Sequence, residues 1–124
     1  MHIFLLGGTG SIGGAVLRHL VAADHKVTAL ARSENSADRL SRAGATPLMG
    51  DMADPAPWMP EAAKTDVFIH LGSSFDDEMA NSEPRLLASL LACAKDRPTP
   101  LRVLYTGGCW MFGQTGNAVA TEAS

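Results

Sequence analysis

The chain has 124 residues, enough for one compact domain with an ordinary core and too few for two. Ten Lys and Arg against 13 Asp and Glu give a formal charge of −3, which offers no support for a nucleic-acid partner or an anionic membrane surface. Two cysteines are too few for a disulfide framework or a metal site, and no apolar run is long enough to span a membrane. Because no leader precedes the first apolar run, we expect a cytoplasmic protein.

The strongest pattern lies at the start of the chain. An apolar run over 1–6, expected to be a strand, leads directly into Gly7, Gly10 and Gly13, and apolar spacing over 12–23 predicts a helix after them. A helix N-terminus has unpaired N–H groups and partial positive charge, which suit a pyrophosphate, and glycines let phosphates approach the backbone. An ordinary packing turn would use the same glycines. The strand before and the helix after favour a dinucleotide site.

A second predicted strand, over 27–30, is followed by Arg32 and Ser33. An acidic residue at this place would hydrogen-bond the ribose 2′-hydroxyl of NAD and repel a 2′-phosphate. A guanidinium beside a hydroxyl suits a phosphate instead, and Arg39 follows about two helical turns later. The sequence therefore favours NADP over NAD as the cofactor, the alternative being that Arg32 is a surface arginine in a loop.

The rest of the chain alternates helical and strand patterns. We expect a helix capped by Asn35-Ser36 and stopped at Gly44, a strand over 46–49, a short irregular helix starting at Asp54-Pro55, a strand over 66–71, a helix over 86–94 after the polar stretch 75–82, a strand over 101–105, and an irregular tail over about 109–124. This rhythm predicts an α/β domain over 1–124, a doubly wound parallel sheet of five strands in the order 3-2-1-4-5. Ligands of such sheets bind at the carboxyl ends of the strands.

Four segments together resemble the extended or atypical short-chain dehydrogenases/reductases, the NAD-dependent epimerase/dehydratase family: 7–14, Gly50-Asp51, 66–74 and 105–113. The resemblance covers essentially the whole chain but only the N-terminal, cofactor-binding half of the family's usual length. The expected Rossmann-like domain is therefore incomplete relative to the family, and the substrate is left open.

The resemblance implies a set of cofactor contacts. They are Gly7, Gly10, Ser11, Ile12 and Gly13 at the pyrophosphate, Asp51 and Met52 at the adenine, Leu71, Gly72 and Ser73 along the ribose and phosphate, and Thr106 and Gly107 near the nicotinamide ribose. Two alternatives stay open. Asp51 is also a natural turn or cap residue after Gly50, and Ser73 with Ser74 would also suit a solvated loop.

The family's catalytic residues are missing from their expected places. Gly108 stands where the resemblance places a serine, and the only tyrosine, Tyr105, has Cys109 rather than a lysine four residues later. We therefore expect no catalytic residue and no metal ligand in this chain, and the chain alone to be inactive. The histidines, including His2 and His70, are interpreted as structural, and Cys109 as a small buried apolar residue.

Two hypotheses follow. In one, the chain is the cofactor-binding portion of a longer NAD(P)-dependent oxidoreductase, epimerase or dehydratase; in the other, it is a free-standing, non-catalytic nucleotide-binding or sensor module. In either, we expect Trp110, Met111 and Phe112 to be exposed beside an uncovered last strand, and the protein to self-associate there.

Overall fold

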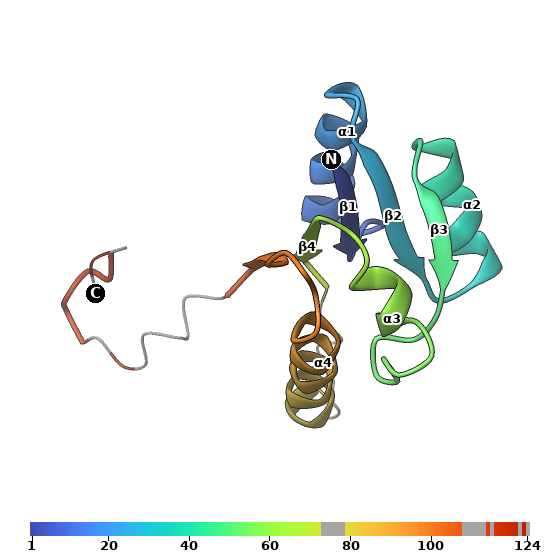
Figure 1. Ribbon diagram of the computed structural model, residues 1–124. Helices are drawn as coiled ribbons and strands as arrows, with labels where there is room; N and C mark the ends of the chain where they lie inside the picture. The colour runs from blue at the N-terminus through green and yellow to red at the C-terminus, as the bar shows by residue number, and fades with distance from the viewer. Residues whose placement is uncertain (73–78, 108–113, 115, 122, 124) are drawn as a thin grey trace.

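A computed structural model describes residues 1–72, 79–107, 114, 116–121 and 123. The strands are β1 (His2–Leu6), β2 (Lys26–Ala31), β3 (Thr46–Met49), β4 (Val67–His70) and β5 (Arg102–Tyr105), and the helices are α1 (Ser11–Ala22), α2 (Glu34–Arg42), α3 (Met59–Ala62) and α4 (Met79–Ala94). All strand pairs are parallel, and the sheet has the order β3-β2-β1-β4-β5 (Figure 1), which confirms the predicted topology.

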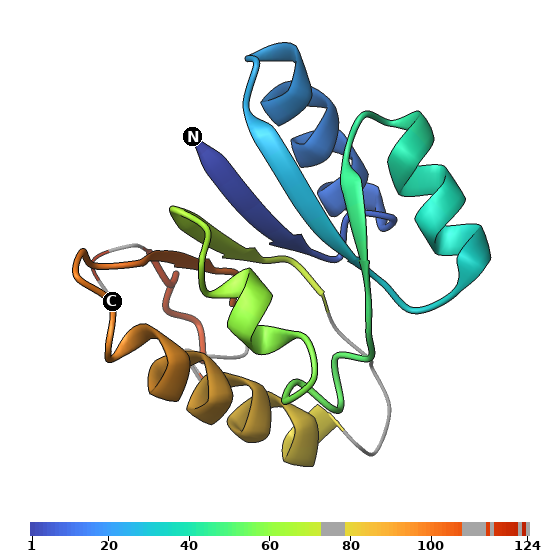
Figure 2. The ribbon, with the colours of Figure 1, turned by 45° about the vertical axis from the view of Figure 1, so that its right-hand side comes forward.

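The sheet is covered on both faces, with α1 and α2 on one side and α3 and α4 on the other (Figure 2). Alternate residues of β1 supply the two cores, because successive side chains of a strand point to opposite faces. Ile3 and Leu5 pack in the core shared with α1 and α2, whereas Phe4 and Leu6 pack in the core of α3 and α4. All four side chains are at most 2% exposed, so the first strand is the centre of the molecule.

The start of α2 differs from the prediction. Ser33, and not Asn35-Ser36, is the N-cap: its backbone is extended, and its hydroxyl oxygen accepts a 3.1 Å hydrogen bond from the Ser36 N–H. The cap lies earlier than predicted because Ser33, two residues after the end of β2, already has the extended backbone that a cap requires. The predicted end is confirmed, since Gly44 adopts a left-handed φ of +94° just after the helix.

The short helix predicted after Asp54-Pro55 is present as α3, but its predicted start is wrong. Asp54 lies in a turn, where its N–H donates to the Asp51 carbonyl oxygen at 3.0 Å, and α3 begins only at Met59. Because the Asp54 N–H and the Asp51 carbonyl oxygen are paired in this turn, no helix starts at Asp54. The polar stretch predicted before α4 is also partly wrong, because this helix begins at Met79 and contains Pro84.

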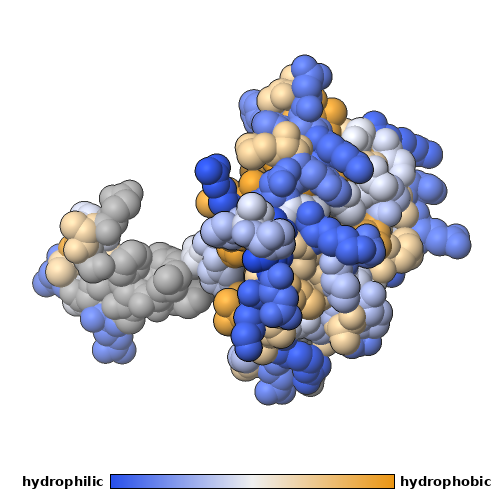
Figure 3. Space-filling model, in the orientation of Figure 1, coloured by the Kyte–Doolittle hydropathy of each residue, from blue (hydrophilic) through white to orange (hydrophobic). Residues whose placement is uncertain are grey.

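Strand β5, at one edge of the sheet, is far more exposed to solvent than the inner strands. All residues of β5 are exposed, with Val103 at 42%, Leu104 at 58% and Tyr105 at 49%. The remainder of the visible surface is predominantly hydrophilic, with scattered apolar patches (Figure 3). Among the described residues, no helix is both long and apolar enough to cross a membrane. Trp110, Met111 and Phe112 lie outside the described residues.

Candidate functional site: the glycine turn and the carboxyl ends of the strands

The turn between β1 and α1 requires glycine at its first position. Gly7 has a left-handed φ of +85°, and a Cβ atom there would lie 2.6 Å from the Leu71 carbonyl oxygen. The Gly7 carbonyl oxygen accepts a 3.1 Å hydrogen bond from the Gly10 N–H, which closes the turn. Both the backbone angle and the close approach of the Leu71 carbonyl, just after β4, therefore exclude a side chain at this position.

The third glycine of the pattern brings the helix onto the turn. A Cβ atom at Gly13 would lie only 1.7 Å from the Gly7 carbonyl oxygen, so any other residue would push α1 away. The N-cap, Gly10, has no side chain to satisfy the N–H groups of the first turn. Ser11 and Ile12 are exposed there, and Ile12 exposes 65% of an apolar side chain. The geometry leaves an open, partly positive helix end at the carboxyl edge of β1.

The predicted segment after β4 lies directly against this turn. Leu71 extends the pairing of the strands, since its N–H donates to the Leu6 carbonyl oxygen at 3.0 Å. A Cβ atom at Gly72 would meet the Met52 sulfur at 3.2 Å and the Gly7 nitrogen at 3.6 Å. Three segments that are far apart in the sequence therefore approach one another so closely that a side chain at Gly72 would crowd the Met52 sulfur. Ser73, the next predicted contact, lies outside the described residues.

Asp51 is exposed beside Met52 and is partly engaged in its own turn. One carboxylate oxygen, Oδ1, accepts a 2.9 Å hydrogen bond from the Ala53 N–H. This bond agrees with the alternative interpretation of Asp51 as a turn residue. Oδ2 has no hydrogen-bond partner within the described part of the chain. The Asp51 carbonyl oxygen accepts a 2.8 Å bond from the Trp58 indole N–H. The carboxylate is thus held at the carboxyl edge of the sheet with one oxygen left for a donor.

Trp58 is a positioning residue that the sequence analysis did not find. Its side chain is 1% exposed and stacks on Phe4 with ring centroids 5.5 Å apart. Because its indole N–H holds the Asp51 backbone, the core of the α3 face fixes the place of that loop. A lone tryptophan in a proline-rich segment was the only signal in the sequence.

The positive side of the site lies between α1 and α2. The Arg39 guanidinium donates to the Thr9 carbonyl oxygen at 3.2 Å, directly beside the glycine turn. A cavity of about 250 Å³ opens there, and both Arg18 and Arg39 line it. Arg18 was missed, although it comes one helical turn after Gly14 and could have been found from that spacing. A larger hollow, of about 420 Å³ beside the end of α4, includes no residue of the glycine turn.

The two residues expected to contact the ribose 2′ position, Arg32 and Ser33, differ in whether their side chains are already hydrogen-bonded. Arg32 is exposed immediately after β2 and is open to a ligand. The Ser33 hydroxyl already caps α2, and it also donates to the Ser36 hydroxyl at 3.1 Å. Arg32 is therefore the freer of the two candidates. Thr106 and Gly107 are exposed after β5, and the Thr106 N–H donates to the His70 carbonyl oxygen at 3.2 Å.

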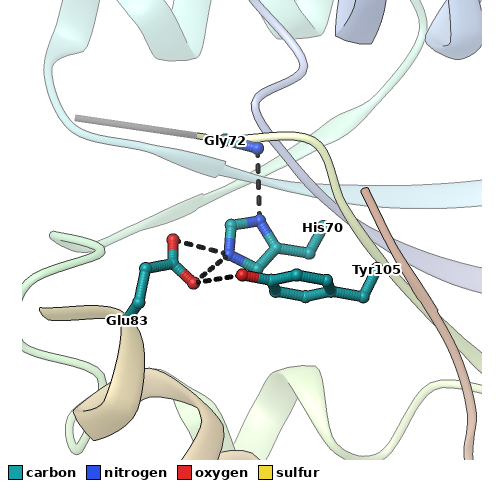
Figure 4. Close-up of polar contacts among 4 residues, drawn as sticks. All are labelled: His70, Gly72, Glu83 and Tyr105. Atoms are coloured by element: carbon teal, nitrogen blue, oxygen red, sulfur yellow. Dashed lines mark hydrogen bonds and ion pairs between the residues drawn. The ribbon is translucent and has the colours of Figure 1, made fainter. Parts of the chain in front are cut away.

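The two histidines that lie in strands, His2 and His70, have defined structural partners. The Nε2 atom of His2 lies 2.8 Å from the Thr28 hydroxyl, and burial lowers the pKa of His2, helped by the nearby charge of Lys26. His70 is 4% exposed and contacts Glu83 and Tyr105, two residues that the sequence did not link to it (Figure 4). Over the described residues there is no group of three or more side chains able to hold a metal ion.

These features define a dinucleotide-binding α/β domain of the doubly wound type. A protein-family model described as NAD(P)H-binding matches residues 7–98. The chain therefore belongs to this NAD(P)H-binding family. The match begins at the first glycine of the turn and continues through α4.

The chain is also similar to one curated enzyme in sequence and to two solved structures in fold. It is 39% identical, over 66% of its length, to the sterol-4-alpha-carboxylate 3-dehydrogenase, decarboxylating, of Dictyostelium discoideum, of which it covers 24%. Two solved structures have the same fold at 20% identity. A blue fluorescent protein from a metagenomic library, in complex with NADPH, has a TM-score of 0.73 and is matched over 90% of this chain and 57% of that one. A UDP-glucose-4-epimerase from Stenotrophomonas maltophila, with bound NAD, has a TM-score of 0.74 and is matched over 100% of this chain and 42% of that one.

The chain spans less than half the length of the curated relatives that it matches. The family match contains the glycine turn and the strands β2, β3 and β4. In doubly wound folds, dinucleotides bind at such a turn and at the carboxyl ends of the strands. The expected family is thereby confirmed as NAD(P)H-binding, and the fold is the one that solved epimerase and NADPH-complexed structures also have.

Proposed function

We propose that this chain is the dinucleotide-binding portion of an NAD(P)-dependent oxidoreductase, epimerase or dehydratase, and that it binds NADP in preference to NAD. The proposed contacts are Gly7, Gly10, Ser11, Ile12, Gly13, Arg32, Ser33, Asp51, Met52, Leu71, Gly72, Ser73, Thr106 and Gly107. The observation that carries the proposal is the fit of α1 to the glycine turn, where a side chain at Gly13 would overlap the Gly7 carbonyl oxygen.

The preference for NADP rests on the charges around the adenosine end. Arg32 follows β2 in the place where an acidic residue would select NAD. Arg39 and Arg18 line the cavity beside Thr9, so a further negative charge bound there would find cations on two sides. A guanidinium binds phosphate oxygens through paired N–H groups, which favours the 2′-phosphate over a hydroxyl.

The arginine substitution Arg32→Ala tests this preference. Loss of one charge-assisted contact should weaken NADPH binding about tenfold or more and change NADH binding by less than about twofold. Arg42→Ala is the matched control, because it removes the same charge from an exposed position in the last turn of α2, away from the end of β2. Calorimetric titration of the three proteins gives the affinities. Equal losses for both nucleotides in Arg32→Ala would contradict the assignment.

We propose that the reaction itself needs residues which this chain does not contain. The chain has no Tyr-x-x-x-Lys pair, and its one tyrosine, Tyr105, lies at the end of an exposed strand. The alternative, a free-standing nucleotide-binding module, is separated from this proposal by the intact mass of the protein from its natural source. A mass near 13.0 kDa supports the module, and a mass twice as large or more supports the enzyme.

The proposal includes self-association and a cytoplasmic location. The exposed apolar side chains of β5 support association through this strand, because an open strand edge pairs readily with a second chain. The free thiol of Cys93 fits a reducing compartment.

A further inference from the structure

The one buried histidine of β4 has partners on both of its ring nitrogens. Nδ1 of His70 lies 3.2 Å from the backbone nitrogen of Gly72, and Nε2 lies 3.1 Å from each carboxylate oxygen of Glu83. Figure 4 shows the imidazole between these two groups, with the ring of Tyr105 beside it. The side chain therefore joins the turn after β4 to helix α4.

The partners determine which nitrogen carries the proton. A backbone N–H can only donate, so Nδ1 of His70 must accept from Gly72. An ionised carboxylate can only accept, so Nε2 must carry the hydrogen that Glu83 receives. The Tyr105 hydroxyl donates to the Glu83 Oε2 atom at 3.2 Å, which holds this carboxylate in the accepting role. All the contacts are satisfied together by the neutral imidazole with its hydrogen on Nε2.

The peptide held in this way is the one that faces the glycine turn. The carbonyl of Leu71 and the N–H of Gly72 belong to one planar trans peptide, so they point in opposite directions. The carbonyl oxygen is the atom that a Cβ at Gly7 would meet at 2.6 Å, whereas the N–H is the atom bound to His70. Rotation of this peptide would break the hydrogen bond to His70 and move the Leu71 carbonyl oxygen away from Gly7.

We propose that His70 is a positioning residue for the nicotinamide dinucleotide. Its neutral imidazole is oriented by Glu83 and accepts a hydrogen bond from the Gly72 N–H. This bond holds the Leu71–Gly72 peptide with its carbonyl oxygen against Gly7, beside the proposed cofactor site. This role rests on the proposed function, because it requires the cofactor to lie against that peptide. Glu83, a carboxylate of α4 outside the proposed cofactor contacts, orients the imidazole in the wild type.

Two substitutions separate positioning from simple filling of the core. In His70→Asn the Oδ1 atom occupies the same position along the side chain as Nδ1, so it accepts from Gly72 but is too short to reach Glu83. His70→Gln extends towards Glu83 and places no acceptor at the Nδ1 position. His70→Leu removes both contacts. The proposal predicts NADPH affinity about tenfold lower in the Gln and Leu variants and within about threefold of wild type in the Asn variant.

The experiment is a calorimetric titration of the wild type and the three variants with NADPH, accompanied by thermal melts monitored by circular dichroism. The predicted order of affinity is wild type, then Asn, then Gln and Leu. A Gln variant that binds as well as or better than the Asn variant overturns the inference. If the Leu variant does not fold, the comparison of Asn with Gln still decides. A wild type that binds neither NADPH nor NADH overturns the proposed function, and the inference with it.

A spectroscopic measurement tests the geometry without any cofactor. Nitrogen-15 spectra of the wild type at pH 7.5 should show His70 unprotonated at Nδ1 and protonated at Nε2. Replacement Glu83→Gln supplies an amide that can donate to Nε2, so the proton distribution of His70 should change in this variant. A wild-type imidazole protonated at Nδ1 would contradict the proposed hydrogen bond from Gly72.

Discussion

The two halves of the sheet are built by different means. Around β1 and α1, backbone atoms approach each other so closely that glycine is required at Gly7 and Gly13. Around β4, α4 and β5, the arrangement depends on a side-chain network centred on His70, and the last strand remains exposed. The first half is therefore fixed by close backbone contacts, which leave no room for a side chain at these two glycines. In the second half, side-chain contacts of His70 join β4 to α4 and to β5.

The largest effect should come from Gly13→Ala. Its methyl group would overlap the Gly7 carbonyl oxygen, so we expect a loss of about 2–3 kcal/mol in the free energy of unfolding and a fall of about a hundredfold or more in NADPH affinity. Gly14→Ala is the matched control, since its Cβ atom would meet its nearest neighbours at 3.7 Å. This control should stabilise the helix by up to about 1 kcal/mol and change NADPH affinity far less than Gly13→Ala does, although Gly14 lines the cavity beside Arg18. Urea unfolding and calorimetry provide the measurements, and similar behaviour of the two variants would refute the steric account.

The next effect concerns the loop that carries Asp51. Trp58→Ala removes the stack on Phe4 and leaves a large cavity, so the free energy of unfolding should fall by about 3–5 kcal/mol. Trp58→Phe keeps an aromatic ring and loses the hydrogen bond to the Asp51 carbonyl oxygen, at a cost of about 1 kcal/mol beyond its smaller packing loss. Urea denaturation compares the two variants. A loss below about 1 kcal/mol for Trp58→Ala would show that the core of the α3 face does not hold this loop.

The exposed strand should control association. We expect Leu104→Lys to shift the protein towards monomer, because a charge at the centre of β5 opposes pairing with a second copy. Leu91→Lys on α4 is the control, since Leu91 is 70% exposed and lies outside the strand. Light scattering at high concentration reports the mass. A wild type that stays monomeric throughout would exclude this association.

The smallest effect is a pH dependence carried by His2. Burial lowers the pKa of this histidine below its ordinary value of 6.5, with Lys26 acting in the same direction and Asp66 against it. The folded state therefore binds the proton less readily than the unfolded state, and stability falls as the pH drops below 6.5 towards the lowered pKa. The urea midpoint of the wild type should thus fall more than that of His2→Gln between about pH 7.5 and 5.5. A larger fall of the urea midpoint in His2→Gln than in the wild type would contradict a lowered pKa of His2.

Much of the fold was predictable because its signals are local. The strand of 46–49, the glycine turn and the stop at Gly44 all follow from apolar runs and from backbone angles that glycine adopts readily. The start of α2 was predicted two or three residues late, because Ser33 and Ser36 are both acceptable caps in sequence and only the end of β2 decides between them.

The parts of the site that were missed depend on contacts between distant segments. His70 is 13 residues from Glu83 in the chain, and nothing in the spacing of either residue indicates that they meet. The hydrogen bond from Trp58 to the Asp51 carbonyl oxygen was missed for a similar reason. The residues between them form a turn, whereas the sequence predicted that a helix starts there. Arg39 was expected near the adenosine end, but its bond to the Thr9 carbonyl oxygen follows from the packing of α2 beside the glycine turn.

The central claim is that this chain holds a nicotinamide dinucleotide at the glycine turn, with NADP preferred. The most direct measurement is a calorimetric titration of the 124-residue protein with NADPH and, in parallel, with NADH. We predict saturable binding with one nucleotide per chain and a higher affinity for NADPH. Absence of binding by both nucleotides would contradict the claim, and tighter binding of NADH would overturn the role assigned to Arg32.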